Sequence, residues 1–311
     1  MKTRNLIRLT ALLIAVIGLS FSGCKKDKNN NDATDTSSMQ QLANDENQVQ
    51  NASDEAMNDV DILLSGTSLK STEILPCNAT LDSTRTVGDT ITLYVTYNGY
   101  NCNHTRIRTG HVEIRKLVGT PWSQAGATVL VKHINFTITR VSNGKTITLN
   151  GTKIHQNVSG GFISELGNGT VTSIVHKTTG YETVTFSDNT TRTWNIARKK
   201  TFTGTPTLLV LTLEGFGSAV NYNNLVVWGT DRKGENFYTR ITQPVVLRQH
   251  CDWDPCIGVK IHEIPSDSKS ATITFGYNNN NQPITGDECP TKFRVDWQKN
   301  NHSGTIYLPL P

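Results

Sequence analysis

The chain has 311 residues, of which 36% are hydrophobic and 18% charged, with 30 Lys and Arg against 26 Asp and Glu. Three of the basic residues, Lys2, Arg4 and Arg8, lie in an N-terminal stretch of 23 residues that contains no acid, so the rest of the chain is nearly neutral. The sequence holds no basic stripe of the kind that nucleic-acid binding requires, which excludes nucleic acid as a partner.

The first 23 residues have the organisation of a secretory signal peptide. Behind the basic residues lies the apolar run ALLIAVIGL at 11–19, which is shorter than the roughly 20 apolar residues that span a bilayer. The segment ends in LSFSGC, which resembles a lipobox, although Phe21 stands where an aliphatic residue is usual. We therefore predict a lipoprotein signal peptide at 1–23 and acylation of Cys24, which would anchor the chain in a membrane. The alternative is an ordinary signal peptide with a chance cysteine.

Two segments follow the predicted anchor. Residues 24–37 are almost wholly polar and are predicted to form a disordered tether. Residues 38–66 predict an amphipathic helix, because apolar side chains recur at spacings of three, four and seven, with polar residues at two skipped positions of the stripe. The apolar members are Met39, Leu42, Val49, Ala56, Val60 and Leu63, and the polar ones are Glu46 and Ser53. The helix either packs one narrow face on the rest of the protein or acts as a spacer.

From residue 67 onward the sequence is rich in Thr, Val, Ile, Asn and Gly and alternates with period two. Many short, evenly spaced runs of this kind predict an antiparallel all-β protein, either a β-sandwich or an extended β-meander. We place a β region with a central meander at 67–245 and a C-terminal β module at 246–311. Near the centre, Val184 and Phe186 are expected to share one buried face with Trp194 and Ile196.

The cysteines suggest a duplicated β module. A Pro-Cys pair, a strand with Thr-Ile-Thr, a second cysteine and another strand occur in the same order at 76–116 and at 255–297. The parallel predicts the disulfides Cys77–Cys102 and Cys256–Cys289, in an oxidising compartment outside the cytoplasm. The competing arrangement pairs Cys251 with Cys289 and leaves Cys256 free. In the duplication, Ile91 and Ile273 would both face the core, at equivalent sheet positions.

Several stretches resemble uncharacterised β-rich lipoproteins of Bacteroidota. They are the acidic ASDEAMNDVD at 52–61, ITQPVVL at 241–247, the cysteine-flanked TITFGYN strand at 272–278 and the closing GTIYLPL at 304–310. The resemblance implies an outer-membrane lipoprotein that faces the periplasm or the cell surface. It implies no activity, because that family has none assigned.

The sequence contains no recognisable catalytic signature. It lacks the GxSxG elbow of serine hydrolases and the HExxH helix of metalloproteases. Four residues, His250, Cys251, Cys256 and His262, could host zinc, but a disulfide with nearby surface histidines is the favoured interpretation outside the cytoplasm. Asp252 and Asp254, which flank Trp253, could bind calcium or sugar, and a solvated turn is favoured. We predict no catalytic residue, no metal and no cofactor.

Two hypotheses of function remain. The first is a non-catalytic envelope protein, which binds a glycan or an envelope protein or serves a structural role. The second is a polysaccharide-acting enzyme on a β scaffold, for which a pair of carboxylates is required. Glu165, Glu182, Glu214 and Glu235 are candidates only as acids within the β region, where a lone Glu is usually exposed. A deep pocket with shifted carboxylates would favour catalysis, and a flat face would favour binding.

The lipobox generates a direct prediction about anchoring. Replacing Cys24 by Ser removes the only thiol that can be acylated at that site, so the protein should leave the membrane fraction. Detergent phase separation of the native envelope measures this. Partition of the Cys24→Ser variant with the detergent phase, as for the unchanged chain, would contradict the prediction.

Overall fold

The computed structural model describes residues 32–65 and 75–310. The predicted signal peptide, Cys24 and tether residues 24–31 lie outside the described residues. No helix within the described part of the chain is both long and apolar enough to cross a membrane.

The protein is all-β with one long helix, as the sequence predicts, and the sheet is an extended antiparallel meander rather than a sandwich. Within the described residues, fifteen strands form one sheet, and most of them pair with their neighbours in the chain. The strands are β1 (Ala79–Val87), β2 (Thr90–Tyr100), β3 (Arg106–Leu117), β4 (Ala127–Arg140), β5 (Thr146–Asn157), β6 (Ile174–Phe186), β7 (Thr191–Thr205), β8 (Leu208–Gly215), β9 (Gly217–Ala219), β10 (Tyr222–Thr230), β11 (Asn236–Arg248), β12 (Pro255–Ile264), β13 (Lys269–Tyr277), β14 (Lys292–Lys299) and β15 (His302–Pro309).

The meander is interrupted once, between β7 and β11. One stretch of β7 pairs with β10, and another stretch of β7 pairs with β8. In the same way, one stretch of β11 pairs with β10 and another pairs with β8. The two shorter strands thus share the space between β7 and β11, with β8 beside the Arg248 end of β11. The sheet continues through β11 and β12, across the boundary between our two predicted β regions.

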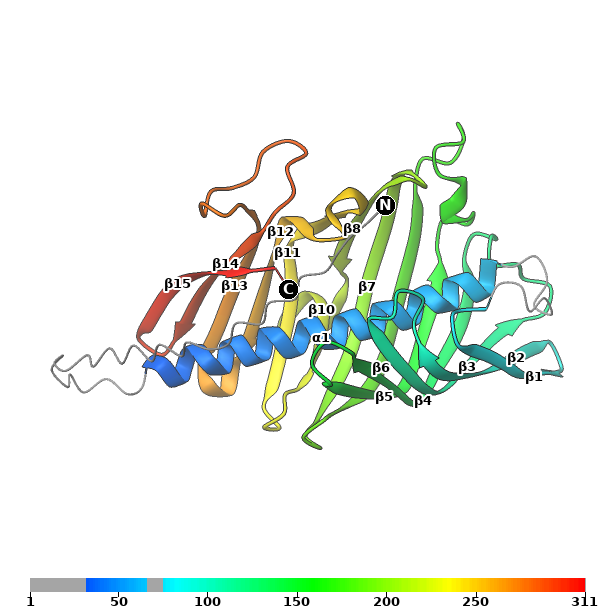
Figure 1. Cartoon of the computed structure of the whole chain (residues 1–311), viewed down its shortest axis with the longest axis horizontal. Coiled ribbons are helices and arrows are strands. Elements are labelled where there is room, and N and C mark those ends of the chain that lie inside the picture. Colours follow the sequence, from blue (N-terminus) through cyan, green and yellow to red (C-terminus); the bar gives the residue numbers. More distant parts are fainter. Residues whose placement is uncertain (1–31, 66–74, 311) are drawn as a thin grey trace, which may run out of the picture.

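The helix α1 (Asp32–Ser65) lies across one face of the sheet and crosses its strands (Figure 1). It begins inside the segment 24–37 that we expected to be a disordered tether. Of the predicted stripe, Val49, Ala56, Val60 and Leu63 are buried in the same apolar cluster as the sheet residues. The side chains of Met39 and Leu42 lie outside those described. The helix therefore packs on the sheet and is no free spacer.

The buried face expected in the centre of the sheet is confirmed. Val184, Phe186, Trp194 and Ile196 are all buried in the main cluster, on the face that α1 covers. This face also carries charged side chains. Glu182 and Arg192 point to the same face of the sheet as these apolar residues and are as deeply buried as they are. Our expectation that a strand Glu would be exposed is wrong for Glu182.

Ion pairs join the helix to the sheet. Glu46 of α1 binds Arg192 of β7 at 3.0 Å, with both side chains at most 2% exposed. Asp54 binds Arg198 of β7 at 3.1 Å, and Lys153 of β5 donates to Ser53 at 2.9 Å. Acids on the helix thus meet cations on the sheet. Glu46 and Ser53, the two polar interruptions of the predicted stripe, are buried because the facing sheet residues are polar too.

A second buried group lies within the sheet. Glu182 of β6 binds Lys153 at 2.9 Å and the Nδ1 atom of His133 of β4 at 2.5 Å, and all three side chains are inaccessible to water. Burial alone would raise the pKa of Glu182, but Lys153 and His133 outweigh burial and lower it to about 2. Since Lys153 also reaches Ser53, this group connects the helix to the middle of the sheet.

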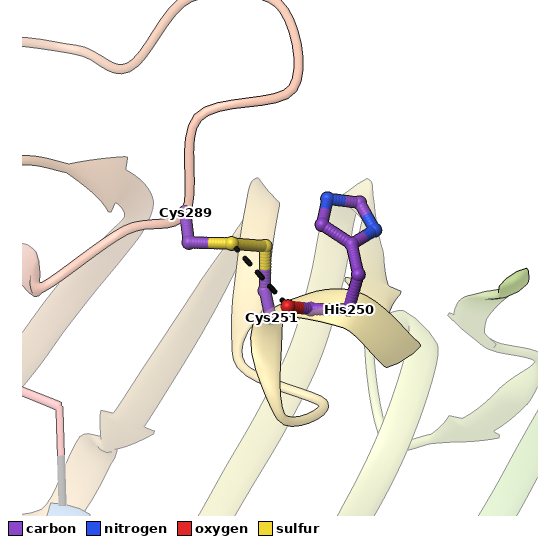
Figure 2. A group of neighbouring side chains, drawn as sticks. All are labelled: His250, Cys251 and Cys289. Carbon is purple, nitrogen blue, oxygen red and sulfur yellow. Dashed lines mark hydrogen bonds between the residues drawn. A yellow bond between two sulfur atoms is a disulfide. The ribbon is translucent and has the colours of Figure 1, made fainter.

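The structure corrects one predicted disulfide. Cys77 is bonded to Cys102, as expected, but Cys289 is bonded to Cys251 and not to Cys256 (Figure 2). Cys251 ends the short 3-10 helix η3 (Gln249–Cys251), next to the loop that carries Cys289, whose Sγ lies 3.8 Å from the His250 carbonyl oxygen. Cys256 is buried in β12 without a disulfide, and burial raises the pKa of its thiol.

The correction weakens the proposed duplication. Ile91 packs against the main core and Ile273 is buried, so both point inward as predicted. Their positions differ, however, because Ile91 is at the start of β2 whereas Ile273 is in the middle of β13. The two Pro-Cys modules are similar hairpins that do not share disulfide connectivity.

The buried pair Glu46–Arg192 generates a stability prediction. Glu46→Leu leaves the Arg192 guanidinium buried without its carboxylate, which should lower the free energy of unfolding by about 3–5 kcal/mol. Lys199→Met, also on β7, is the matched control: its pair with Glu214 is 36% exposed on both sides, so the loss should stay below about 1 kcal/mol. Urea unfolding followed by tryptophan fluorescence measures both. Equal losses in the two variants would contradict a buried, structural pair.

The low pKa of Glu182 generates a pH prediction. A carboxyl that titrates at about 2 when folded, against 4.5 as its ordinary value, stabilises the fold fully above pH 4.5. That stability, on the order of 3 kcal/mol, should be lost as the pH falls from about 4.5 to about 2. Urea unfolding across this range measures the slope, which should be shallower in Glu182→Gln. An unchanged slope in the variant would show that Glu182 does not titrate in this way.

Candidate functional site

A cavity of about 920 Å³ lies between the C-terminal half of α1 and the sheet. The helix forms a polar wall of carboxylates and amides, and the opposite wall carries apolar residues together with polar ones, among them Asn101, Arg106 and Arg108. This wall comes from the β2–β3 loop and β3, from the loop before β4, from the segment around the 3-10 helix η2 (Ile163–Glu165), from β6, β7, β8 and β11, and from the turn after η3. Its apolar residues are Trp122, Phe162, Ile163, Phe202, Leu209, Leu211, Leu247 and Trp253. The cavity therefore combines a group of apolar residues with polar ones, as ligand pockets often do.

Two tryptophans take different positions in this wall. Trp122 is buried, stacks on the His155 ring with 5.0 Å between centroids, and meets His176 edge to face at 5.4 Å. Trp253 is 38% exposed, in a turn where it and Asp252 both have left-handed backbone angles, φ 65° and 54°. Such a φ is uncommon for a bulky residue and signals local strain. The Cys251–Cys289 disulfide fixes the start of this turn (Figure 2).

The acids of the polar wall are occupied by cations of the sheet. Asp54 binds Arg198 and also Lys200, at 3.0 Å, and these charges lower its pKa to about 2 although burial opposes the shift. Glu55 binds Arg106 of β3 at 2.6 Å. Every one of these contacts joins α1 to the sheet.

Asp59 is the one acid of this wall whose pKa is shifted upward. It is bonded to Arg108 of β3, yet burial outweighs that charge and raises the pKa of the carboxyl to about 6. Asp59 and Asp54 thus differ widely in acidity, which is the contrast that a catalytic acid and base would show. Structural ion pairs produce the same contrast, and both carboxylates are engaged in them.

At one end of the cavity, Asp61 of α1 meets two histidines of the sheet. Its Oδ1 lies 3.0 Å from Nε2 of His155 on β5, and its Oδ2 lies 3.6 Å from Nδ1 of His176 on β6. Burial alone would raise the pKa of Asp61, but the two rings hold it well below its usual range. Burial lowers the pKa of His155 and outweighs Asp61.

Most of the residues that the sequence analysis considered as metal ligands or catalytic acids lie outside the cavity. His262 is buried on β12, not on the surface as expected, and bonds Thr239 at 2.8 Å; burial lowers its pKa to about 4. Cys251 is committed to its disulfide, so the four residues 250, 251, 256 and 262 form no zinc site. None of the four glutamates considered as catalytic, Glu165, Glu182, Glu214 and Glu235, lines the cavity. Asp252 and Trp253 do line it.

Sequence reasoning missed the cluster of Asp61, His155 and His176. Asp61 and His155 are 94 residues apart in the chain and share no motif. A weak signal was available, because His155 and His176 lie in neighbouring strands of a predicted meander, and both stand on the face that a helix was expected to cover. Comparison with known proteins finds no family model, no curated protein and no solved structure that matches this chain.

Proposed function

We propose that this protein is a membrane-anchored envelope lipoprotein whose β body binds a glycan in the cavity beside α1, without transforming it. The observation that carries the proposal is the composition of the cavity walls. Sugar rings offer an apolar face, which stacks on aromatic side chains, and a rim of hydroxyls, which bond carboxylates and amides. Trp253 and Phe162 line one wall, and the amides of Asn51 and Asn58 line the other. The volume falls within the range of small-ligand pockets.

Binding is favoured over catalysis by the state of the carboxylates. Asp54, Glu55 and Asp59 each hold a cation of the sheet, and those pairs attach the helix. A glycosidase needs one carboxyl that gives up a proton and another that attacks or activates water, both free to approach the bond that breaks. The contrast in pKa between Asp59 and Asp54 supports an enzyme as second candidate. Turnover would require breaking the contacts that hold α1.

The experiment is an oligosaccharide array probed with the full chain in detergent, followed by titration of each glycan that binds. Trp253→Ala should weaken binding about tenfold, which corresponds to the 1.4 kcal/mol expected of one aromatic contact. Tyr181→Ala is the matched control, because Tyr181 is an exposed aromatic residue that does not line the cavity. It should leave binding unchanged.

Three results would overturn the proposal. They are the absence of binding to every arrayed glycan, equal affinity in Trp253→Ala and the unchanged chain, and shortening of a bound oligosaccharide on incubation, detected by mass spectrometry. The last result would establish the enzyme instead.

A further inference from the structure

We propose that Asp61, His155 and His176 bind a divalent metal ion, zinc by preference, at the end of the cavity. The three residues come from α1, β5 and β6, and one ligand atom from each lies within 4.8 Å of the others. Zinc bonds of about 2.0–2.1 Å at tetrahedral angles place ligand atoms about 3.3 Å apart. Asp61 Oδ1 lies 3.0 Å from Nε2 of His155 and Oδ2 lies 3.6 Å from Nδ1 of His176, so each ring nitrogen is near that spacing from one of the two carboxylate oxygens.

The strongest sign of a ligand is the state of His176. Its side chain is 3% exposed, its Nδ1 lies 3.6 Å from Asp61 Oδ2, beyond a normal hydrogen bond, and its Nε2 has no hydrogen-bond partner among the residues that the structure describes. Buried polar atoms are nearly always satisfied, so such a ring calls for an explanation. His176 lines the cavity together with Asp61, which places both beside the space that an ion would occupy. A coordinated ion would satisfy one nitrogen of this ring.

The surroundings of His155 suit a metal ligand. Its Nδ1 lies 2.9 Å from the hydroxyl of Thr178, which can accept the Nδ1 proton when Nε2, 3.0 Å from Asp61, gives up its own proton to bind an ion. Trp122 stacks on the ring and limits its rotation. Metal-binding histidines typically have such a partner on the second nitrogen, which fixes the ring and its tautomer.

The set of ligands indicates the kind of ion. Two imidazoles and one carboxylate suit zinc, whereas calcium and magnesium prefer oxygen ligands alone. Three protein ligands leave a fourth position, and the cavity provides the space for it. The nearby cation Lys200 is balanced by Asp54 at 3.0 Å, so it does not stand as an uncompensated positive charge. The inference stands apart from the proposed glycan binding, because the ion needs only these three side chains.

The second group of potential ligands in the described chain, His250, Cys251 and Cys289, does not compete. Its two sulfurs are bonded to each other, so neither is available as a thiolate. His250 is exposed, and it therefore provides a matched control for the loss of one histidine.

The experiment titrates Zn²⁺ into the full chain, purified in detergent and freed of metal with EDTA, with no glycan present. One equivalent should bind. His176→Ala should weaken binding at least about a hundredfold, since it removes a ligand, and Thr178→Val about ten- to a hundredfold, since it removes the partner of a ligand. His250→Ala should bind as the unchanged chain does. Co²⁺ in place of Zn²⁺ should give the strong visible absorption of a low-coordinate site.

The proposal fails if the unchanged chain binds no Zn²⁺, or if His176→Ala binds as tightly as the unchanged chain. It also fails if His250→Ala loses as much affinity as His176→Ala. Circular dichroism checks that the His176→Ala variant keeps its fold. If that variant nevertheless unfolds, Thr178→Val and the Co²⁺ spectrum of the unchanged chain decide the matter. Glycan binding is measured separately, so one proposal can fail without the other.

Discussion

A helix rich in acids lies against a sheet face that carries the matching cations, and the side chains of Arg108, Arg192 and Arg198 are almost wholly buried. Taking such charges from water is costly, and their mutual attraction repays the cost only where the geometry is good. Glu46 with Arg192, and Asp54 with Arg198 and Lys200, meet that condition. Apolar contacts alone would allow the helix to slide or rotate, because they have no direction. The ion pairs fix one position of the helix along the sheet, and the cavity depends on that position.

The cavity exists because the helix and the sheet do not meet evenly. The main apolar cluster includes helix residues from Val49 to Leu64, so the helix packs on the sheet over this length. Other helix residues of the same stretch, from Gln50 to Ile62, line the cavity together with loops and with strands that include β8, and there the space is not filled. The turn that carries Trp253 closes part of this space. Its left-handed backbone is held by the neighbouring Cys251–Cys289 bond, so the second disulfide belongs to the site as much as to the fold.

Local patterns in the sequence predicted what local physics determines. Period-two alternation predicted the strands and the buried face of β6 and β7, and the helical spacing of Val49, Ala56 and Val60 predicted the docked face of α1. The sequence could not predict which cysteine reaches Cys289, because this depends on where the η3 turn falls relative to a distant loop. The metal-binding cluster was hidden for the same reason. Only the pairing of β5 with β6 and the position of the helix bring Asp61 to the histidines.

The candidate site is divided between the helix and the sheet, and this has a consequence for how it works. An ion held by Asp61 and His155 would bind the docked arrangement alone, since a displaced helix would take the carboxylate away from the rings. By linkage, an ion at this site stabilises the docked helix, and any force that moves the helix weakens the site. The helix is also the element that follows the predicted lipid anchor along the chain. Anchoring, helix docking and ligand binding would then share one structural element, although His155 lies 94 residues from Asp61 in the sequence.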